Sequence, residues 1–125
     1  MRIAEVAKQF DISADTLRYY ERIGLLPHVR RNESGIRDYS EQDLARIRFV
    51  KCMRGANVSI EALIEYMDLF EGGDATLGAR KAILEEERDK VRERMAEMQA
   101  GLDRLDYKIA HYEDLIIQAE KGMAD

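Results

Sequence analysis

A seven-residue apolar repeat in the C-terminal part of the chain constrains the fold more than any other feature. From about residue 77 to residue 119 there is no proline, and apolar residues recur at alternating spacings of three and four. The residues of this apolar stripe are Leu84, Val91, Met95, Met98, Leu102, Leu105, Ile109, Tyr112 and Ile116. Such spacing is typical of the a and d positions of a coiled coil. We predict one long helix here, which would exceed about 60 Å in length.

A helix of this length cannot bury its apolar stripe against a small N-terminal domain, so it needs a partner helix. A second copy of the chain is the simplest partner, and we therefore predict a homodimer. Lys81 and Arg88 fall on the same register, so the stripe is weak or different at its N-terminal end. The run Glu85-Glu86-Glu87 is interpreted as a solvated helix face.

The N-terminal part of the chain has the pattern of short helices joined by tight connections. Apolar residues at positions 3, 6, 7 and 10 lie on one face of a short helix. Ser13 is a good N-cap for a second helix that runs to about Ile23 and stops at Gly24. Two short helices joined in this way indicate a helix-turn-helix.

The segment that follows predicts a small β-hairpin and two further helices. Two β-prone runs, at 29–31 and 36–39, flank the turn Asn32-Glu33-Ser34-Gly35. Ser40 with Asp43 forms a capping box that opens a helix over about 41–54, and Ser59 caps another over about 60–70. We predict a mainly α fold. Residues 1–72 form a winged helix-turn-helix with a hairpin wing, and residues 73–125 form a linker and a coiled-coil dimerisation helix.

Charge is distributed unevenly along the 125 residues, whose net charge is −5. Residues 1–54 hold 11 Lys and Arg against 8 Asp and Glu, whereas residues 55–125 hold 9 against 17. A basic head on an acidic tail suggests that one end meets a polyanion, although an ordinary uneven surface would give the same pattern. No apolar run approaches the roughly 20 residues of a membrane span, and the first ten residues lack a signal-peptide stretch. We expect a cytoplasmic protein with no membrane partner.

The sequence offers no constellation of residues for catalysis. The single cysteine, Cys52, excludes an intramolecular disulfide and a cysteine cluster for zinc. There is no paired acid and base, no nucleophile with a partner histidine and no glycine-rich phosphate loop. We expect no enzyme activity, no bound metal and no cofactor.

Three segments, Thr16 to Glu21, Gly24-Leu25 and Arg30 to Tyr39, resemble the signature of the MerR family of bacterial transcription regulators. The order of helix, loop and coil agrees with that family. The resemblance implies a homodimer that binds a promoter with an overlong spacer between its two polymerase elements. It also implies that the regulator bends and untwists this DNA so that RNA polymerase engages both elements. Backbone contacts can repay the strain energy of such deformation.

Arginines and tyrosines of the head are candidates for contact with DNA. On the second helix, Arg18, Tyr19 and Arg22 are the outward candidates. Arginine binds phosphate or guanine, and tyrosine hydroxyls donate to phosphate. The resemblance implies contacts from the recognition helix and the wing, through Arg18, Tyr19, Tyr20, Arg30, Arg31, Arg37 and Tyr39. A solvated surface position or a salt bridge is the alternative for each arginine.

Cys52 is the remaining residue whose side chain could react chemically. The stretches Phe49 to Arg54 and Val58 to Leu63 resemble the AdhR/NmlR-like branch of the family, which is associated with aldehydes and other thiol-reactive stress. The resemblance implies that Cys52 is the sensor and forms an adduct with an electrophile. The nearby cations of residues 48, 51 and 54 favour the thiolate, while the C-terminal end of a helix opposes it.

Other interpretations stay open. Cys52 among apolar neighbours can be a small core residue, in which case the effector is a non-covalent small molecule. The chain can also be a coiled-coil interaction module whose helix-turn-helix binds another protein.

Overall fold

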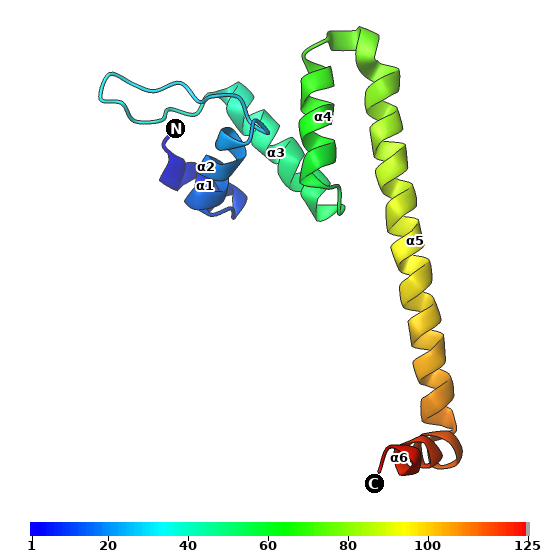
Figure 1. Cartoon of the computed structure of the whole chain (residues 1–125). Helices are drawn as coiled ribbons and strands as arrows, with labels where there is room; N and C mark the ends of the chain where they lie inside the picture. The colour runs from blue at the N-terminus through cyan, green and yellow to red at the C-terminus, as the bar shows by residue number, and fades with distance from the viewer. Residues whose placement is uncertain (125) are drawn as a thin grey trace. The chain divides into compact units, whose positions relative to one another are not determined.

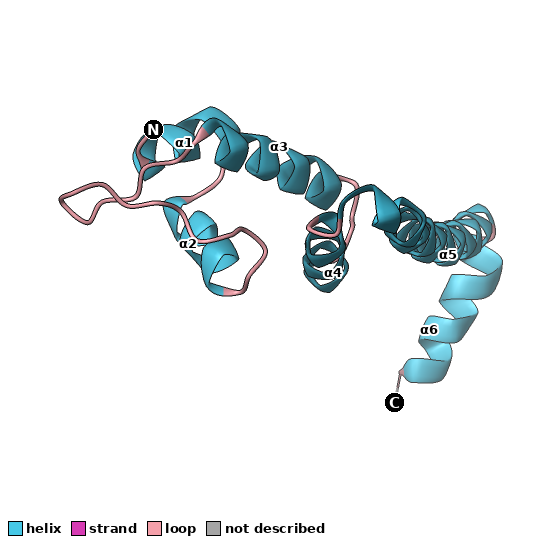
Figure 2. Cartoon of the chain, turned by 90° about the horizontal axis from the view of Figure 1, so that it is seen from above, coloured by secondary structure: helices cyan, strands magenta, loops and turns pink. Residues whose placement is uncertain are grey.

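The computed structural model describes residues 1–124, and apart from its loops it is helical (Figures 1 and 2). The elements in chain order are α1 (Ile3–Phe10), α2 (Ala14–Arg22), α3 (Glu41–Gly55), α4 (Ile60–Phe70), the 3-10 helix η1 (Gly73–Thr76), α5 (Leu77–Ala110), the π-helical η2 (Tyr112–Ile116) and α6 (Ile117–Met123). The chain divides into two units, Met1–Glu87 and the residues from Arg88 onward, so the first turns of α5 belong with the N-terminal helices.

Side-chain caps begin three of the helices where the sequence places them. The Ser13 hydroxyl accepts a hydrogen bond from a first-turn backbone N–H of α2, at 3.0 Å. Ser40 and Asp43 exchange hydrogen bonds as a capping box at α3, and Ser59 caps α4. Gly24, just beyond α2, has φ of +83°, a conformation that glycine adopts without strain. These boundaries follow from local chemistry, which is why the sequence predicts them.

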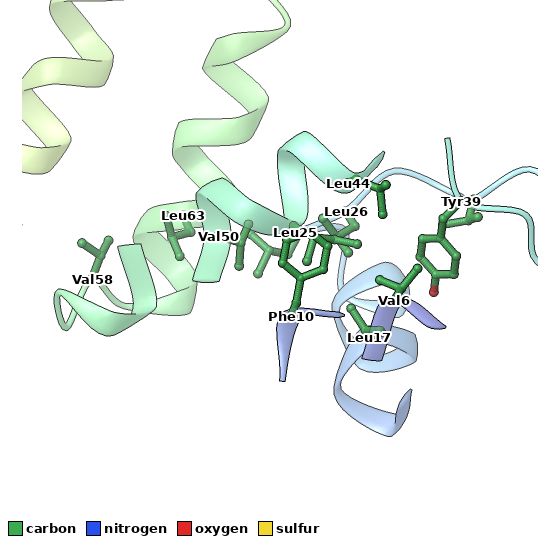
Figure 3. Packing of buried hydrophobic residues seen from close by; sticks show 12 residues of the cluster. Val6, Phe10, Leu17, Leu25, Leu26, Tyr39, Leu44, Val50, Val58 and Leu63 are labelled. Atoms are coloured by element: carbon green, nitrogen blue, oxygen red, sulfur yellow. The ribbon is translucent and has the colours of Figure 1, made fainter. Parts of the chain in front are cut away.

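A buried apolar cluster holds the first unit together. Figure 3 shows its members meeting between α1, α2, α3, the start of α4 and the connecting segments. The buried members are Val6, Phe10, Leu17, Leu25, Leu26, Val29, Tyr39, Leu44, Ile47, Val50, Val58 and Leu63. Leu84 of α5 packs against this cluster, so the N-terminal end of the apolar stripe serves the core of its own chain.

The beginning of α5 returns along α4 in the opposite direction. At one end, the Arg80 guanidinium lies over the Phe70 ring, 5.4 Å from its centroid. At the other end, Glu87 Oε1 accepts a hydrogen bond from the backbone N–H of Ser59 at 2.7 Å. Glu87 is buried, so its interpretation as part of a solvated face is wrong. A carboxylate at this position complements the positive N-terminal end of α4.

The predicted hairpin wing does not form strands within residues 1–124. We call residues 29–39 the wing loop, and its two arms share only the antiparallel bridge between Arg31 and Arg37. Its tip is held by the Asn32 side chain, which accepts hydrogen bonds from the backbone N–H groups of Ser34 and Ile36. A side chain that bonds the backbone in this way replaces ladder hydrogen bonds, so the segment is a loop.

The prediction of one continuous helix to residue 119 is also wrong. α5 ends at Ala110, His111 has non-helical dihedral angles, and η2 and α6 follow. Tyr112 and Ile116 therefore lie beyond the end of the regular helix. A π-helical turn changes the number of residues per turn, so the heptad spacing no longer keeps these two on the line of the stripe.

None of the helices within residues 1–124 combines the length with the apolar character needed to cross a bilayer.

Candidate nucleic-acid interface

The outer face of α2 presents cations and an aromatic ring. Arg18, Tyr19 and Arg22 are exposed, and the Arg22 guanidinium lies over the Tyr19 ring at 5.3 Å from its centroid. Arg18 Nη1 pairs with the carboxylate of Asp15 at 2.9 Å, on the surface. Exposed pairs of this kind contribute little free energy, so Arg18 can exchange this carboxylate for a phosphate. This face has the chemistry of a recognition helix.

Tyr20 differs from its neighbour on α2. It is half-buried and packs against the core cluster, and its ring centroid lies 6.2 Å from that of Tyr19. Tyr19 therefore faces outward, whereas Tyr20 anchors α2 to the core cluster.

Two arginines of the wing loop are exposed. Arg30 and Arg31 lie before the tip, and Arg31 Nη1 donates to the Gly35 carbonyl oxygen at 2.8 Å. This bond orients the guanidinium and leaves most of its five donors for an external acceptor. Arginine in this setting suits bidentate binding of phosphate.

Arg37 connects the wing loop to α2. Its Nε lies 3.0 Å from Oε1 of Glu21, and the two side chains are only 21% and 9% exposed. Burial alone would raise the pKa of Glu21. The hydrogen bond and charge of Arg37, with hydrogen bonds from His28 and the Val29 backbone, outweigh burial and lower the pKa. Arg37 is therefore a positioning residue as well as a cation near the surface.

Glu21 is not among the residues predicted from the sequence. A carboxylate four residues after the inward Leu17 lies on the same face of its helix, and this placement is the signal that could have identified it. A buried carboxylate needs a charged partner, which the fold supplies from a segment 16 residues away.

Tyr39 lies in the core, which corrects its place among the DNA-contacting residues. Figure 3 shows its ring among the buried apolar side chains. It is 3% exposed, and its hydroxyl is enclosed without a hydrogen-bond partner among residues 1–124. Burial raises the pKa of Tyr39. In this conformation the hydroxyl does not reach a phosphate.

Cys52 is exposed on α3, so its interpretation as a core residue does not describe this structure. The three cations expected to favour its thiolate are directed to other groups. Arg48 lies over the Phe10 ring, Lys51 donates to the Phe10 carbonyl, and Arg54 donates to the Val58 carbonyl. The thiol is accessible, and any effect of these cations on it is exerted without direct contact.

The predicted dimerisation residues fall into two groups. Leu84, Val91 and Ile116 are partly covered by their own chain. The others are exposed: Met95, Met98, Leu102, Leu105 and Ile109 form the apolar stripe of the second unit, and Tyr112 lies beyond the end of α5. Within residues 1–124 no group of three or more His, Cys, Asp or Glu gathers as a metal site would require.

A helix-turn-helix with a basic outer face, followed by a long amphipathic helix, defines a helix-turn-helix regulatory protein. Residues 1–69 match the family described as MerR HTH family regulatory protein, and residues 44–107 match the one described as MerR, DNA binding. The chain belongs to the MerR family.

Individual relatives agree with this assignment. The transcriptional regulator AdhR of Bacillus subtilis is 62% identical over 91 residues, which are 73% of this chain and 65% of AdhR. The match thus spans slightly less than two thirds of that relative's length. A MerR family regulator of Listeria monocytogenes aligns with a TM-score of 0.75 and 46% identity, covering 98% of this chain and 93% of that one. HiNmlR, a MerR family regulator lacking the sensor domain and bound to promoter DNA, aligns with a TM-score of 0.68 and 33% identity, covering 90% and 89%.

Proposed function

We propose that this protein is a homodimeric transcription regulator that binds promoter DNA and remodels an overlong promoter spacer. RNA polymerase is then an indirect partner, and the cytoplasm is the site of action. The observation that carries the proposal is the exposed cationic surface of α2 and the wing loop. It comprises Arg18, Arg22, Arg30 and Arg31.

The geometry suits a duplex better than a protein partner. A recognition helix in the major groove places its outward side chains against base edges and phosphates, and a neighbouring basic loop reaches the adjacent backbone. Glu21 and Arg37 hold α2 and the wing loop in one arrangement, so both can bind the same duplex. The DNA-bound state of HiNmlR supports this use of the fold.

DNA binding is tested with a labelled duplex from upstream of the protein's own gene, against a scrambled duplex of the same composition. A dimer that neutralises about six to ten phosphates loses roughly 10³–10⁵-fold in affinity between about 50 and 200 mM salt. Arg18→Ala is expected to weaken specific binding by at least about tenfold, since a good arginine–base contact contributes about 1–3 kcal/mol. Arg92→Ala, on the exposed surface of α5, is the matched control. An affinity for the duplex that does not change with salt concentration would contradict the proposal.

Cys52 is the proposed sensor, and thiol-reactive electrophiles such as aldehydes are the proposed effectors. Its support is the exposure of the thiol and the 62% identity to AdhR. The thiolate attacks the carbonyl carbon, a C–S bond forms, and the carbonyl oxygen takes up a proton to give a hemithioacetal. Because Cys52 is exposed, an adduct there changes the surface that α3 presents, and we propose that it acts by altering what this surface contacts in the dimer.

Cys52→Ser separates the covalent sensor from a non-covalent one with little change in volume. We expect the variant to bind the operator as the wild type does and to lose induction by aldehyde in a promoter reporter. Mass spectrometry of the intact wild-type protein in the presence of aldehyde should show the added mass, and the Cys52→Ser variant should lack it. A variant that still responds fully would mean that the thiol is structural and that the effector binds elsewhere.

A further inference from the structure

A pocket of about 190 Å³ lies within the first unit, where α3, α4 and the first turn of α5 meet. Its walls are mainly apolar. Phe49 and Tyr66 contribute stacked rings whose centroids lie 5.1 Å apart, and Met67 and Phe70 extend the apolar surface. Two arginines, Arg46 and Arg80, also line it. Neither the DNA-binding face of α2 nor Cys52 contributes to this pocket.

Arg80 is the unusual residue of the pocket. It is 8% exposed, and its guanidinium donates to the Thr76 hydroxyl at 3.0 Å and the Gly73 carbonyl at 3.1 Å. Both acceptors are neutral, and its other contacts are with the faces of the Tyr66 and Phe70 rings. No carboxylate of residues 1–124 forms an ion pair with it. A buried cation ordinarily has an anionic partner, because removing a charge from water is costly.

Arg80 also stands in an unfavourable place on its own helix. It lies in the first turn of α5, where the positive end of the helix dipole favours anions. A cation in the first turn of a helix is therefore a sequence signal for a special role. An external anion would supply the missing partner of Arg80, and it would interact favourably with the positive end of the helix dipole.

Arg46 provides a second cation at the same pocket. It is 25% exposed, and its Nη2 lies 3.4 Å from Oε1 of Glu71, which is 70% exposed. A long pair with so exposed a carboxylate contributes little free energy. The Glu71 side chain can turn into solvent and leave Arg46 to a ligand.

We propose that this pocket binds a small organic anion, with an aromatic or short aliphatic body and one carboxylate. The body packs against the apolar walls, and the carboxylate meets Arg80 and Arg46. The volume is below the roughly 300–1,000 Å³ of sites for drug-sized molecules, so the ligand is about as large as benzoate. The two cations favour an acid over the isosteric neutral amide.

The position of the pocket also gives it a means of regulation, and this step rests on the proposed function. α3 belongs to the DNA-binding head and bears Cys52, whereas α5 leads to the apolar stripe of the second unit. A ligand between α3 and α5 stabilises the arrangement that closes on it, and by linkage alters operator affinity. The same regulator would then respond to a non-covalently bound anion independently of its thiol.

Binding is measured without DNA, so that its failure is distinct from failure of the proposed function. The full chain with Cys52→Ser is titrated with benzoate and, separately, with benzamide, and the methyl signals of its methionines are followed by NMR. We expect benzoate to change the chemical shift of the Met67 methyl group, with a dissociation constant of about 1 mM. Benzamide should bind at least about tenfold more weakly. The Met123 methyl is the internal control.

Three variants locate the site. Arg80→Gln should abolish binding of benzoate, and Ala45→Leu should do so by filling the exposed mouth of the pocket without touching Arg80. Ala45→Leu keeps the test valid if Arg80→Gln fails to fold. Arg92→Gln, with the same loss of charge on α5 away from the pocket, should bind as the parent does.

Three results would overturn the proposal: equal affinity for benzoate and benzamide, undiminished binding by Ala45→Leu, or shifts confined to Met95 and Met98. A fourth is a change of oligomeric state by Ala45→Leu without any binding of benzoate, since the pocket would then be covered by a second copy of the chain.

Discussion

In the first unit of the chain, Met1–Glu87, 12 apolar side chains form a buried cluster, and members such as Leu17 and Leu63 are fully enclosed. In residues 88–124 most of the apolar side chains lie on the surface instead, with Met98 76% and Leu102 51% exposed. The first unit satisfies its apolar side chains within one chain. The second presents an exposed apolar stripe, and large exposed apolar patches are typical of interaction surfaces.

The comparison separates two sources of stability. Burial within one chain stabilises that chain at any concentration, whereas burial between chains depends on protomer concentration. The first unit is therefore expected to stay folded when the proposed dimer dissociates, whereas the second unit is expected to lose stability.

The largest effect is expected from charge on the apolar stripe. Leu102→Glu with Ile109→Glu should convert the dimer to monomers, because two carboxylates per chain would have to be buried in the interface. Sedimentation velocity at micromolar concentration measures this. Arg104→Glu changes the net charge by the same amount on the flanking surface and should leave the dimer intact. A wild-type chain that sediments as a monomer would show that the apolar stripe does not form a dimer interface.

The next largest effect is expected from the core of the first unit. Leu63→Ala should lower the free energy of unfolding of the head by about 2–5 kcal/mol, through lost burial and the cavity left behind. Urea unfolding at two protein concentrations measures it. The decrease should be the same at both, in contrast to Leu102→Ala, whose effect should depend on concentration because it acts through the proposed dimer. A concentration-dependent loss for Leu63→Ala would mean that the head is not self-sufficient.

Arg37→Ala should lower the free energy of unfolding by about 2–4 kcal/mol, because it leaves the Glu21 carboxylate buried without its cation. Arg30→Ala, on the exposed arm of the wing loop, should change it by no more than about 0.5 kcal/mol. Both should weaken DNA binding. Equal stability of the two variants would show that the pair between Glu21 and Arg37 does not contribute to the fold.

The smallest effect concerns pH. Because the pKa of Glu21 is lowered in the folded protein, its ion pair contributes stability above the ordinary glutamate value of 4.5. That contribution is lost as the pH falls from 4.5 through the lowered pKa. In Glu21→Gln this acid-dependent part should be missing, so the difference between wild type and variant should narrow below pH 4.5. A difference that stays constant through this range would assign the acid transition to other carboxylates.

Much of the architecture could be predicted because it depends on neighbours in sequence. Ser13, Ser40 and Ser59 each accept a hydrogen bond from the backbone N–H three residues ahead, so the starts of α2, α3 and α4 follow from a few residues each. The heptad spacing predicts a long helix with an exposed stripe for the same reason. The arginines of α2 and the wing loop could be proposed from a local motif.

The helices, most of their ends, the family and the apolar stripe could be predicted from the amino-acid sequence. The packing of the elements, in contrast, buries Tyr39, brings Arg37 to Glu21, leaves Cys52 exposed and sets Arg80 over two aromatic rings. Each of these depends on groups brought together from distant parts of the chain. Capping and helical periodicity act over one or two turns, whereas burial and ion pairing depend on which elements pack together, and that is set by the whole core.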